Sequence, residues 1–493
     1  MAGIGFQLRR FTQEGTIRGF LKGYYNAALV ASGPWVLTVI TLMVIGWLMR
    51  QTDARADLFL ETVIYIYAFS LITTSPFQLV VTRYLADQLD AQKLTAHIPT
   101  LLSVGTVSSV FHYVLGLVFF SMVKVGWAYT MISAALFAMV CNVWLTMAFV
   151  GAVRAFHLVA TAFSIGTVVS IASAYYLGGA VGEPGYLLGM LLGNSVIVVI
   201  CLTALAREFD SAESFNFEWV EYFVRMPALP VAGVLYYSAI WSSIMITWFT
   251  KGTPVAPHVL YAYEPLDLAS FYAQMTILPA VTLFYVHNET NFYEDYRGFY
   301  NAVMTRRSLA VIEKHKTVLV DNLKDAFVYL TLVQAVVTFT AIAFARPIGV
   351  ALEMQDLERQ LFVNMCLGAF PQALLLFVVV VLFYFQFYRE AALTSGLTLL
   401  GCIGTSLWTL QAGESTYGLG LLGGTGLGLV VGFALLFDRL ERLEYLTFSG
   451  QPMAEELPFE PEMLTESGHF GAYWIRDGKT EVAAAGLPKE PAR

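Results

Sequence analysis

Charge is what this 493-residue sequence has least of. Asp, Glu, Lys and Arg make up 13% of it, whereas soluble globular domains carry about 25%. Apolar residues make up 57%. So little charge cannot cover a water-facing surface, and the composition is typical of a protein that folds in lipid. The net charge of −8, with the basic residues scattered among loops, also argues against a nucleic-acid partner, which would require a basic patch.

Cysteines and catalytic motifs are also scarce. The four cysteines fall inside apolar runs, with no C-x-x-C pair and no histidine at metal-ligand spacing. No P-loop, H-E-x-x-H or G-x-S-x-G motif occurs, so the sequence predicts no cofactor, no metal site and no enzymatic activity. Gly418-x-Gly420-x-x-Gly423 matches the dinucleotide pattern, but it lies in an apolar run and follows no predicted strand. Close helix packing, with Gly420, Gly424, Gly428 and Gly432 on one helical face, is the better interpretation.

Long apolar runs are abundant, and each is long enough to cross about 30 Å of hydrocarbon as a helix. Twelve runs predict an all-α membrane protein, with six on either side of a mixed-charge segment at 207–227. The predicted spans are 27–49, 59–82, 98–123, 127–152, 158–178, 186–206, 228–250, 269–288, 325–345, 361–388, 391–412 and 418–437.

The distribution of basic residues predicts the orientation. With twelve spans, 22 of the 28 Lys and Arg fall on one side and 6 on the other. Because Lys and Arg are retained in the cytoplasm, both termini are expected there, with no cleavable signal. The expected organisation is an amphipathic segment along the membrane face (1–26), six spans (27–206), a cytoplasmic linker (207–227), six spans with a cytoplasmic loop at 289–324 (228–437), and an acidic tail without a core of its own (438–493).

Prolines hint at an internal repeat. Pro76 lies late in the second span, and Pro279 lies midway along the eighth, its counterpart in the second half. An interior proline removes a backbone donor and kinks a helix. Kinks at matching places suit a transporter that opens alternately to either side.

Few polar residues are candidates for function inside the membrane. His112 is the one ionisable residue near a span centre, either as a cavity or proton-linked group or as a neutral histidine bonded to a neighbouring helix. The region 261–300 interleaves Tyr and Phe with Asp and Glu. Sugar rings pack on aromatic faces while carboxylates accept their hydroxyl hydrogens, so this region fits a carbohydrate path. An aromatic belt at the membrane interface would produce the same pattern.

Several short segments resemble the PelG family. They are Ala2-Gly3-Ile4-Gly5-Phe6, Ser32-Gly33-Pro34-Trp35, Ser75-Pro76-Phe77-Gln78-Leu79 with Thr82-Arg83-Tyr84-Leu85, and Glu289-Thr290-Asn291-Phe292-Tyr293-Glu294-Asp295-Tyr296. The resemblance covers roughly 1–440. It implies the multidrug, oligosaccharidyl-lipid and polysaccharide (MOP) flippase superfamily, with two six-helix lobes around a central cavity. It also implies export of Pel, an N-acetylgalactosamine-rich biofilm polysaccharide, across the bacterial inner membrane. The implied partners are a cytoplasmic glycosyltransferase and inner-membrane Pel proteins, including a cyclic-di-GMP receptor.

A polysaccharide transporter is therefore the expected function. The residues expected to line or gate its path are Arg83, His112, Glu264, Asp267, Tyr272, Gln274 and Glu289. One alternative is a cation-coupled small-molecule exporter of the same architecture, although the first span lacks a buried Asp for a cation or proton. A second is a membrane-embedded glycosyltransferase, acyltransferase or scaffold of a polysaccharide synthase, for which the short external loops offer no catalytic platform.

Overall fold

The computed structural model describes residues 17–52, 54–91, 93–153, 156–209, 214–256, 259–287, 292–449, 473–476 and 479–482. Helices dominate these residues. The first half contains α2 (Ile17–Arg50), α3 (Ala56–Asp90), α4 (His97–Ser121), α5 (Trp127–Val153), α6 (Phe156–Val181) and α7 (Glu183–Glu208). The second contains α9 (Ala228–Lys251), α10 (Glu264–Met275), α11 (Leu278–His287), α13 (Leu309–Ala343), α15 (Asp356–Tyr384), α16 (Tyr388–Ala412) and α17 (Leu419–Glu441). Shorter elements are α8 (Glu221–Arg225), β1 (Thr253–Ala256), β2 (Leu260–Ala262), α12 (Tyr293–Met304), α14 (Ala345–Ala351) and α18 (Leu443–Ser449).

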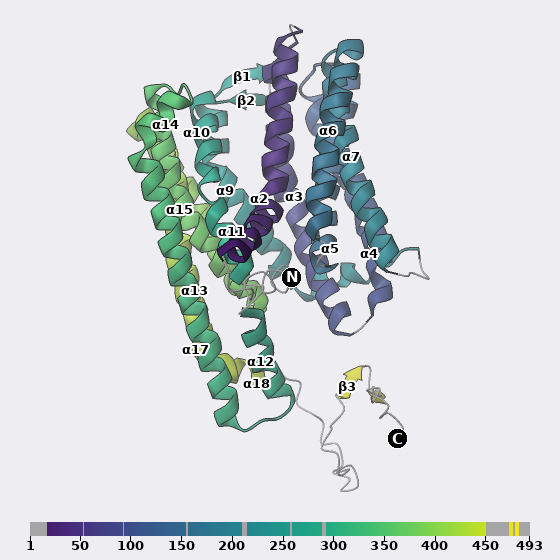
Figure 1. Cartoon of the computed structure of the whole chain (residues 1–493), viewed down its shortest axis with the longest axis vertical. Helices are drawn as coiled ribbons and strands as arrows, with labels where there is room; N and C mark the ends of the chain where they lie inside the picture. The colour runs from purple at the N-terminus through teal and green to yellow at the C-terminus, as the bar shows by residue number, and fades with distance from the viewer. Residues whose placement is uncertain are drawn as a thin grey trace. The chain divides into compact units, whose positions relative to one another are not determined.

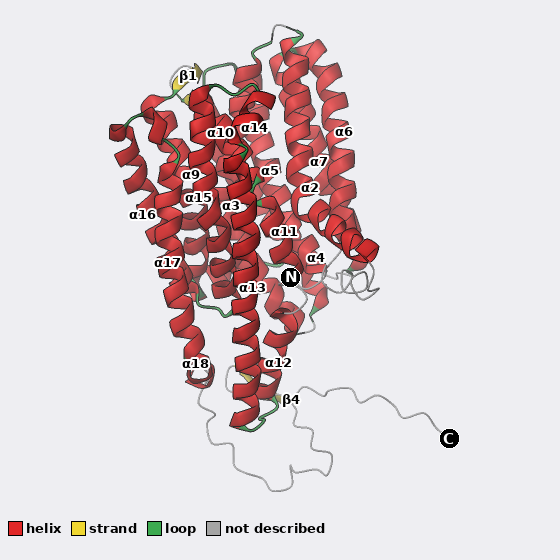
Figure 2. Ribbon diagram, turned by 60° about the vertical axis from the view of Figure 1, so that its left-hand side comes forward, coloured by secondary structure: helices red, strands yellow, loops and turns green. Residues whose placement is uncertain are grey.

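Twelve helical spans among the described residues are long and apolar enough to cross a membrane, with α10 and α11 together forming the eighth. Every predicted span falls on one of them, so the all-α membrane fold is confirmed. The helices α3 to α7, purple to blue, gather on one side of Figure 1, and α10, α13, α15 and α17 gather on the other. Most of the long helices run roughly alongside one another (Figure 2).

The two halves repeat the same packing pattern. In the first lobe α2 packs on α6 and α3 on α5; in the second, the corresponding helices α9 and α16, and α10 and α15, pack together. The lobes contact each other through α3 on α9 and α2 on α11. Each lobe thus uses its first two spans to meet the other. This symmetry is what an internal repeat of six spans produces.

Glycines allow the last two helices of each lobe to approach closely. On α17, a Cβ at Gly424 would overlap Cys402 of α16, and one at Gly428 would overlap Thr398. On α7, a Cβ at Gly189 would overlap Ala174 of α6. The glycine face of α17 is therefore a packing surface, as its spacing predicts, and the dinucleotide pattern there is coincidental.

The predicted kink in the eighth span is a complete break. The helix stops at Met275 and resumes at Leu278, directly before Pro279. Pro279 has no N–H to donate to the carbonyl four residues earlier. In α3, by contrast, Pro76 lies inside a continuous helix, and the Ser75 hydroxyl donates to the Ile72 carbonyl that Pro76 leaves without its usual donor (2.9 Å). The two corresponding prolines thus have different local consequences.

The segments between and after the spans contain more helix than the sequence predicts. The expected loop 289–324 contains α12 and the first half of α13, a helix of 35 residues that also forms the ninth span. The described residues within 295–320 and 439–493 group into a second compact unit, distinct from the unit that contains most of the spans. In it, Lys316 forms an ion pair with Glu444 of α18 (2.5 Å). In the tail, β3 (Tyr473–Arg476) pairs antiparallel with β4 (Lys479–Val482).

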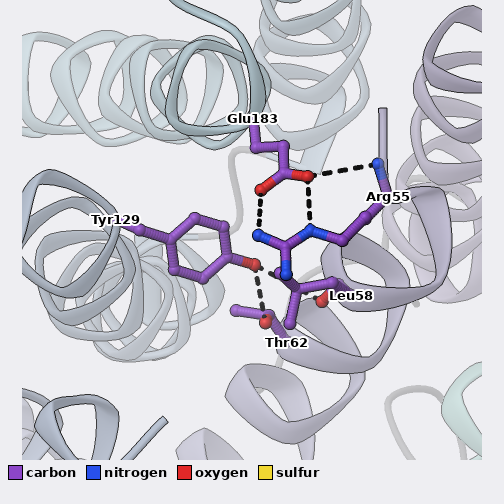
Figure 3. A network of polar contacts seen from close by, with 5 residues as sticks. All are labelled: Arg55, Leu58, Thr62, Tyr129 and Glu183. Atoms are coloured by element: carbon purple, nitrogen blue, oxygen red, sulfur yellow. Dashed lines mark hydrogen bonds and ion pairs between the residues drawn. The ribbon is translucent and has the colours of Figure 1, made fainter. Parts of the chain in front are cut away.

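An ionic clamp ties three helices of the first lobe together near their ends (Figure 3). Arg55, directly before α3, donates through Nε and Nη2 to the two carboxylate oxygens of Glu183, both at 2.7 Å. Beside this pair, the Tyr129 hydroxyl of α5 bonds Thr62 of α3 at 2.8 Å. Glu183 begins α7, so the clamp joins the starts of α3, α5 and α7. The hydrogen bonds that Arg55 donates to Glu183 raise the pKa of Arg55 further.

We expect Arg55→Ala to have only a small effect on stability. The Arg55 side chain is 60% exposed, and ion pairs of this kind contribute about 0 to 1 kcal/mol because solvent screens them. Thermal unfolding of the purified protein in detergent measures the change. Arg359→Ala, which removes a pair with the exposed Asp356, is the control. A loss as large as that caused by emptying a buried core position would contradict this assignment.

Candidate functional site

The seam between the lobes is the candidate site. It consists of the faces of α2 and α3 that meet α9, α10, α11 and the β1–β2 hairpin. Trp35 of α2 stacks on Phe271 of α10, with ring centroids 5.4 Å apart. A Cβ at Gly233 of α9 would lie 2.7 Å from Leu79 and 3.1 Å from Ser75 of α3. The lobes are therefore in tight contact along α3 and α9.

At the end of α9 that leads into the hairpin, aromatic side chains from both lobes pack together. Tyr65 of α3 stacks on Trp248 of α9 at 4.6 Å and 12°. Its hydroxyl donates to the Tyr261 carbonyl of β2 at 2.9 Å and accepts from the Tyr261 N–H at 3.2 Å. These residues belong to one buried cluster that contains side chains of α3, α4, α5, α7, α9 and the hairpin. A shared hydrophobic core thus seals this end of the seam.

Two carboxyl groups lie within this aromatic packing. Asp267 of α10 accepts from Trp248 Nε1 at 2.7 Å and from the Tyr263 backbone N–H at 2.9 Å. Glu61 of α3 is 9% exposed, and its Oε2 is buried without a hydrogen-bond partner. We call Glu61, Tyr65, Trp248, Tyr261 and Asp267 the hairpin-side cluster.

A second polar group lies near the other end of α3, about 30 Å along the helix by its rise per residue. Arg83 pairs with Asp87 at 2.6 Å. When the Gln386 side-chain amide is oriented with its oxygen toward the guanidinium, that oxygen accepts from both terminal nitrogens of Arg83 at 3.2 Å. Gln386 lies between α15 and α16 with φ of +61°, a conformation that is strained for a residue with a side chain. Arg83 of one lobe is therefore bonded to a strained loop of the other.

The segment that joins the two lobes, which contains α8, is hydrogen-bonded to Asp87 of this second polar group. Tyr222 of α8 donates to Asp87 at 2.8 Å. Burial and this hydrogen bond raise the pKa of Tyr222, so it remains a donor. Nearby, Trp219 is buried and its Nε1 donates to Ser103 of α4 at 3.0 Å. We call Arg83, Asp87, Tyr222 and Gln386 the linker-side cluster.

The sequence-predicted residues do not form one site. Asp267 lies in the hairpin-side cluster, Glu264 is exposed at the start of the same helix, and Arg83 lies in the linker-side cluster. Tyr272 packs against the core of the second lobe, where Gln274 exchanges two amide hydrogen bonds with Gln372 of α15.

His112 lies inside the first lobe, beside Phe77 of α3. It is fully buried in the first lobe, its Nδ1 contacts the Ser108 carbonyl at 2.8 Å, and its ring packs edge-on against Phe137. Glu289 lies outside the described residues.

Sequence reasoning missed six members of these clusters, which are Glu61, Tyr65, Asp87, Tyr222, Trp248 and Gln386. Glu61 is the one carboxylate inside the predicted span 59–82, and that position is the signal that could have found it. Trp248 and Gln386 have no such signal, because each lies at the end of an apolar run among similar residues.

The fold is similar to that of solved transporters of the MATE family and the MOP superfamily. An outward-facing MATE family transporter of that superfamily superposes with a TM-score of 0.63 at 10% identity, covering 86% of this chain and 96% of the other. The bent form of the MATE transporter VcmN from Vibrio cholerae gives 0.61 at 13%, covering 86% and 97%. A MOP superfamily transporter from Pyrococcus furiosus, described as having a binding pocket of reverse polarity, gives 0.58 at 11%, covering 85% and 96%.

The chain belongs to the PelG family, described as "Putative exopolysaccharide Exporter (EPS-E)", whose model matches residues 1–448. No curated protein matches the sequence. Family and fold together identify a multi-pass membrane protein of the transporter class.

Proposed function

We propose that this protein moves the polysaccharide Pel across the bacterial inner membrane through the seam between its lobes, by a flippase-like route. The main support for the proposal is the hairpin-side cluster, in which aromatic rings and carboxyl groups lie together between the two lobes. The chain also belongs to a family described as exopolysaccharide exporters. Both termini and the α8 linker then face the cytoplasm, and the hairpin faces the periplasm. The polymer arrives from a cytoplasmic glycosyltransferase, in a complex with inner-membrane Pel proteins that include a cyclic-di-GMP receptor.

The chemistry of the seam suits a sugar chain. The C–H faces of sugar rings pack against aromatic side chains such as Trp35, Tyr65 and Trp248, while carboxylates such as Asp267 accept hydroxyl or amide hydrogens. In the closed arrangement these groups bond one another. Opening the seam frees their faces and acceptors for substrate.

The two clusters provide a gate at each end of the seam. Polymer can enter from the cytoplasm only when the linker-side cluster separates, and it can leave only when the hairpin-side cluster separates. The break between α10 and α11 lies between the two clusters, within the second lobe. It allows the halves of the eighth span to tilt independently, so that one gate can open while the other is held.

Deletion of the gene, with cytoplasmic and extracellular polymer measured separately, tests the function. Loss of extracellular polymer with polymer retained in the cell is the expected result. Normal secretion without the protein would overturn the proposal. Polymer missing from both compartments would favour an enzyme or a scaffold of the synthase.

Arg83→Ala is expected to reduce export strongly at a normal protein level. The change removes the contact to Gln386 and leaves Asp87 with Tyr222 alone, so the linker-side gate no longer closes properly. Secreted polymer, normalised to the amount of protein in the membrane, is the measurement. The control is Arg225→Ala, because Arg225 lies on the same side, is 60% exposed and pairs only within α8. Equal export by the two variants would remove Arg83 from the gate.

A further inference from the structure

We infer that Glu61 is the proton-binding group that controls the hairpin-side end of the seam. With a proton on Glu61 this end is closed, and release of the proton from its carboxyl group to water on the hairpin side opens it. The inference rests on the proposed function only in assigning the seam to transport. The inference adds that a proton is the ion that controls opening of the hairpin-side end.

The position of Glu61 is unusual for a carboxyl group. It is 9% exposed and lies one turn before Tyr65 on α3, and Tyr65 belongs to the core shared by both lobes. Its Oε2 has no donor, and no ion pair involves Glu61 among the residues that the structure describes. An ionised carboxylate buried without a donor is very costly, whereas a protonated one is tolerated. The closed seam therefore selects the protonated form.

The charges that face Glu61 have the same sign. Asp57 lies one turn earlier on α3, and Asp267 and Glu264 face it from α10. The basic residues nearby are engaged or remote, since Arg55 binds Glu183 and Lys251 is exposed at the end of α9. The side chains nearby from other elements, Tyr261 of β2, Tyr263 directly before α10 and Trp248 of α9, carry no basic group. A second negative charge at Glu61 would thus be repelled from Asp267, across the seam between the lobes.

Asp267 and Glu61 have different roles. Asp267 accepts two hydrogen bonds, from Trp248 and from the Tyr263 backbone, and these stabilise its charged form better than the surroundings of Glu61 Oε2 do. Glu61 lacks such donors at Oε2 and can lose its proton only when water enters. Among the described residues no group of three or more His, Cys, Asp or Glu side chains is arranged to hold a metal ion. A proton is the ligand that a single buried carboxyl group without a donor can bind unaided, so we assign a proton to Glu61.

The test measures the width of the hairpin-side end directly. Spin labels on Val181→Cys at the end of α6 and Val350→Cys on α14 report on the two lobes, because both positions are exposed and the four native cysteines are buried. The full-length protein in nanodiscs is measured by pulsed electron spin resonance from acidic to alkaline pH. The wild type is expected to show a longer distance population that grows as pH rises. A distance distribution independent of pH would overturn the inference.

Three variants give the test its specificity. Glu61→Gln, which mimics the protonated side chain and should fold, is expected to stay closed at every pH. Asp267→Asn removes a facing charge, so Glu61 loses its proton more readily and the transition moves to lower pH. Asp57→Asn is the matched control, on the same helix but exposed, and a much smaller shift is expected because water screens its charge.

Retention of the wild-type pH response by Glu61→Gln, or an unshifted transition in Asp267→Asn, would refute the role of Glu61. These distances need no polymer. If the distances do not respond to pH as expected, the proposed export function still stands. If deletion of the gene does not reduce export, the assignment of Glu61 to the gate still stands.

Discussion

Gly424→Val is expected to prevent the protein from accumulating in folded form. The Cβ alone would overlap Cys402 and come within 2.6 Å of the Thr398 carbonyl oxygen, and the two methyl groups would enter α16 further. Overpacking of a dense interior costs about 1 to 3 kcal/mol. Because the obstruction here is partly backbone, relaxation requires α16 and α17 to separate, and the upper end of that range or more is expected.

The matched control for this change is two residues away on the same helix. A Cβ at Gly426 meets nothing within 4 Å, so Gly426→Val adds the same side chain to open space. The measurement is the thermal stability and the monodisperse fraction of each variant in detergent. We expect Gly426→Val to behave as the wild type. Equal stability of the two variants would contradict the close packing of α16 on α17.

Trp248→Ala is expected to destabilise the protein and to impair closure of the hairpin-side end. Trp248 is 1% exposed and stacks on Tyr65 across the seam. Truncation of a buried Trp costs about 3 to 5 kcal/mol. It also removes a donor from Asp267, which leaves a carboxylate with one fewer hydrogen bond in a largely apolar setting. Thermal unfolding and secreted polymer should both fall.

Trp127→Ala separates this effect from the general loss of a tryptophan. Trp127 begins α5 and is 69% exposed, so its removal should change neither stability nor export appreciably. Trp248→Phe should fall between wild type and Trp248→Ala, because it keeps a stacked ring but loses the N–H. Wild-type stability and export by Trp248→Ala would show that the stack does not hold the lobes together.

Hydropathy predicts most of this fold because lipid leaves a helix few alternatives. Every apolar run predicted to span coincides with a helix, and the proline at position 279 correctly marks an interruption in the eighth. The start of α13 was not predictable in this way. Its first half is amphipathic and charged, including Lys314, Lys316 and Asp321, so no apolar run marks it.

The site was less predictable because it depends on contacts between distant segments. The aromatic and acidic residues after position 260 drew attention to the eighth span, and Asp267 does lie at the seam. The partners of that residue are Trp248 of α9 and the backbone of Tyr263 directly before α10, and Glu61 comes from a helix about 200 residues earlier in the sequence. His112 is buried inside one lobe, where its Nδ1 bonds its own helix, and its role in the path stays a prediction. Burial alone does not distinguish the seam from a lobe interior.

The most direct test of transport through the seam is a reversible cross-link across it. A Cβ at Gly233 would lie 3.1 Å from the Ser75 Cβ, close to the separation of about 3.5 to 4.5 Å that a disulfide requires. Ser75→Cys with Gly233→Cys therefore joins the lobes. Gly116→Cys with Ala134→Cys has the same 3.1 Å separation but joins α4 to α5 inside one lobe. Export is measured in cells treated with a membrane-permeant oxidant and then with a reductant. We expect the oxidised seam variant to lose export and to regain it on reduction, while the control exports throughout. A fully cross-linked seam that exports polymer at the wild-type rate would contradict the account.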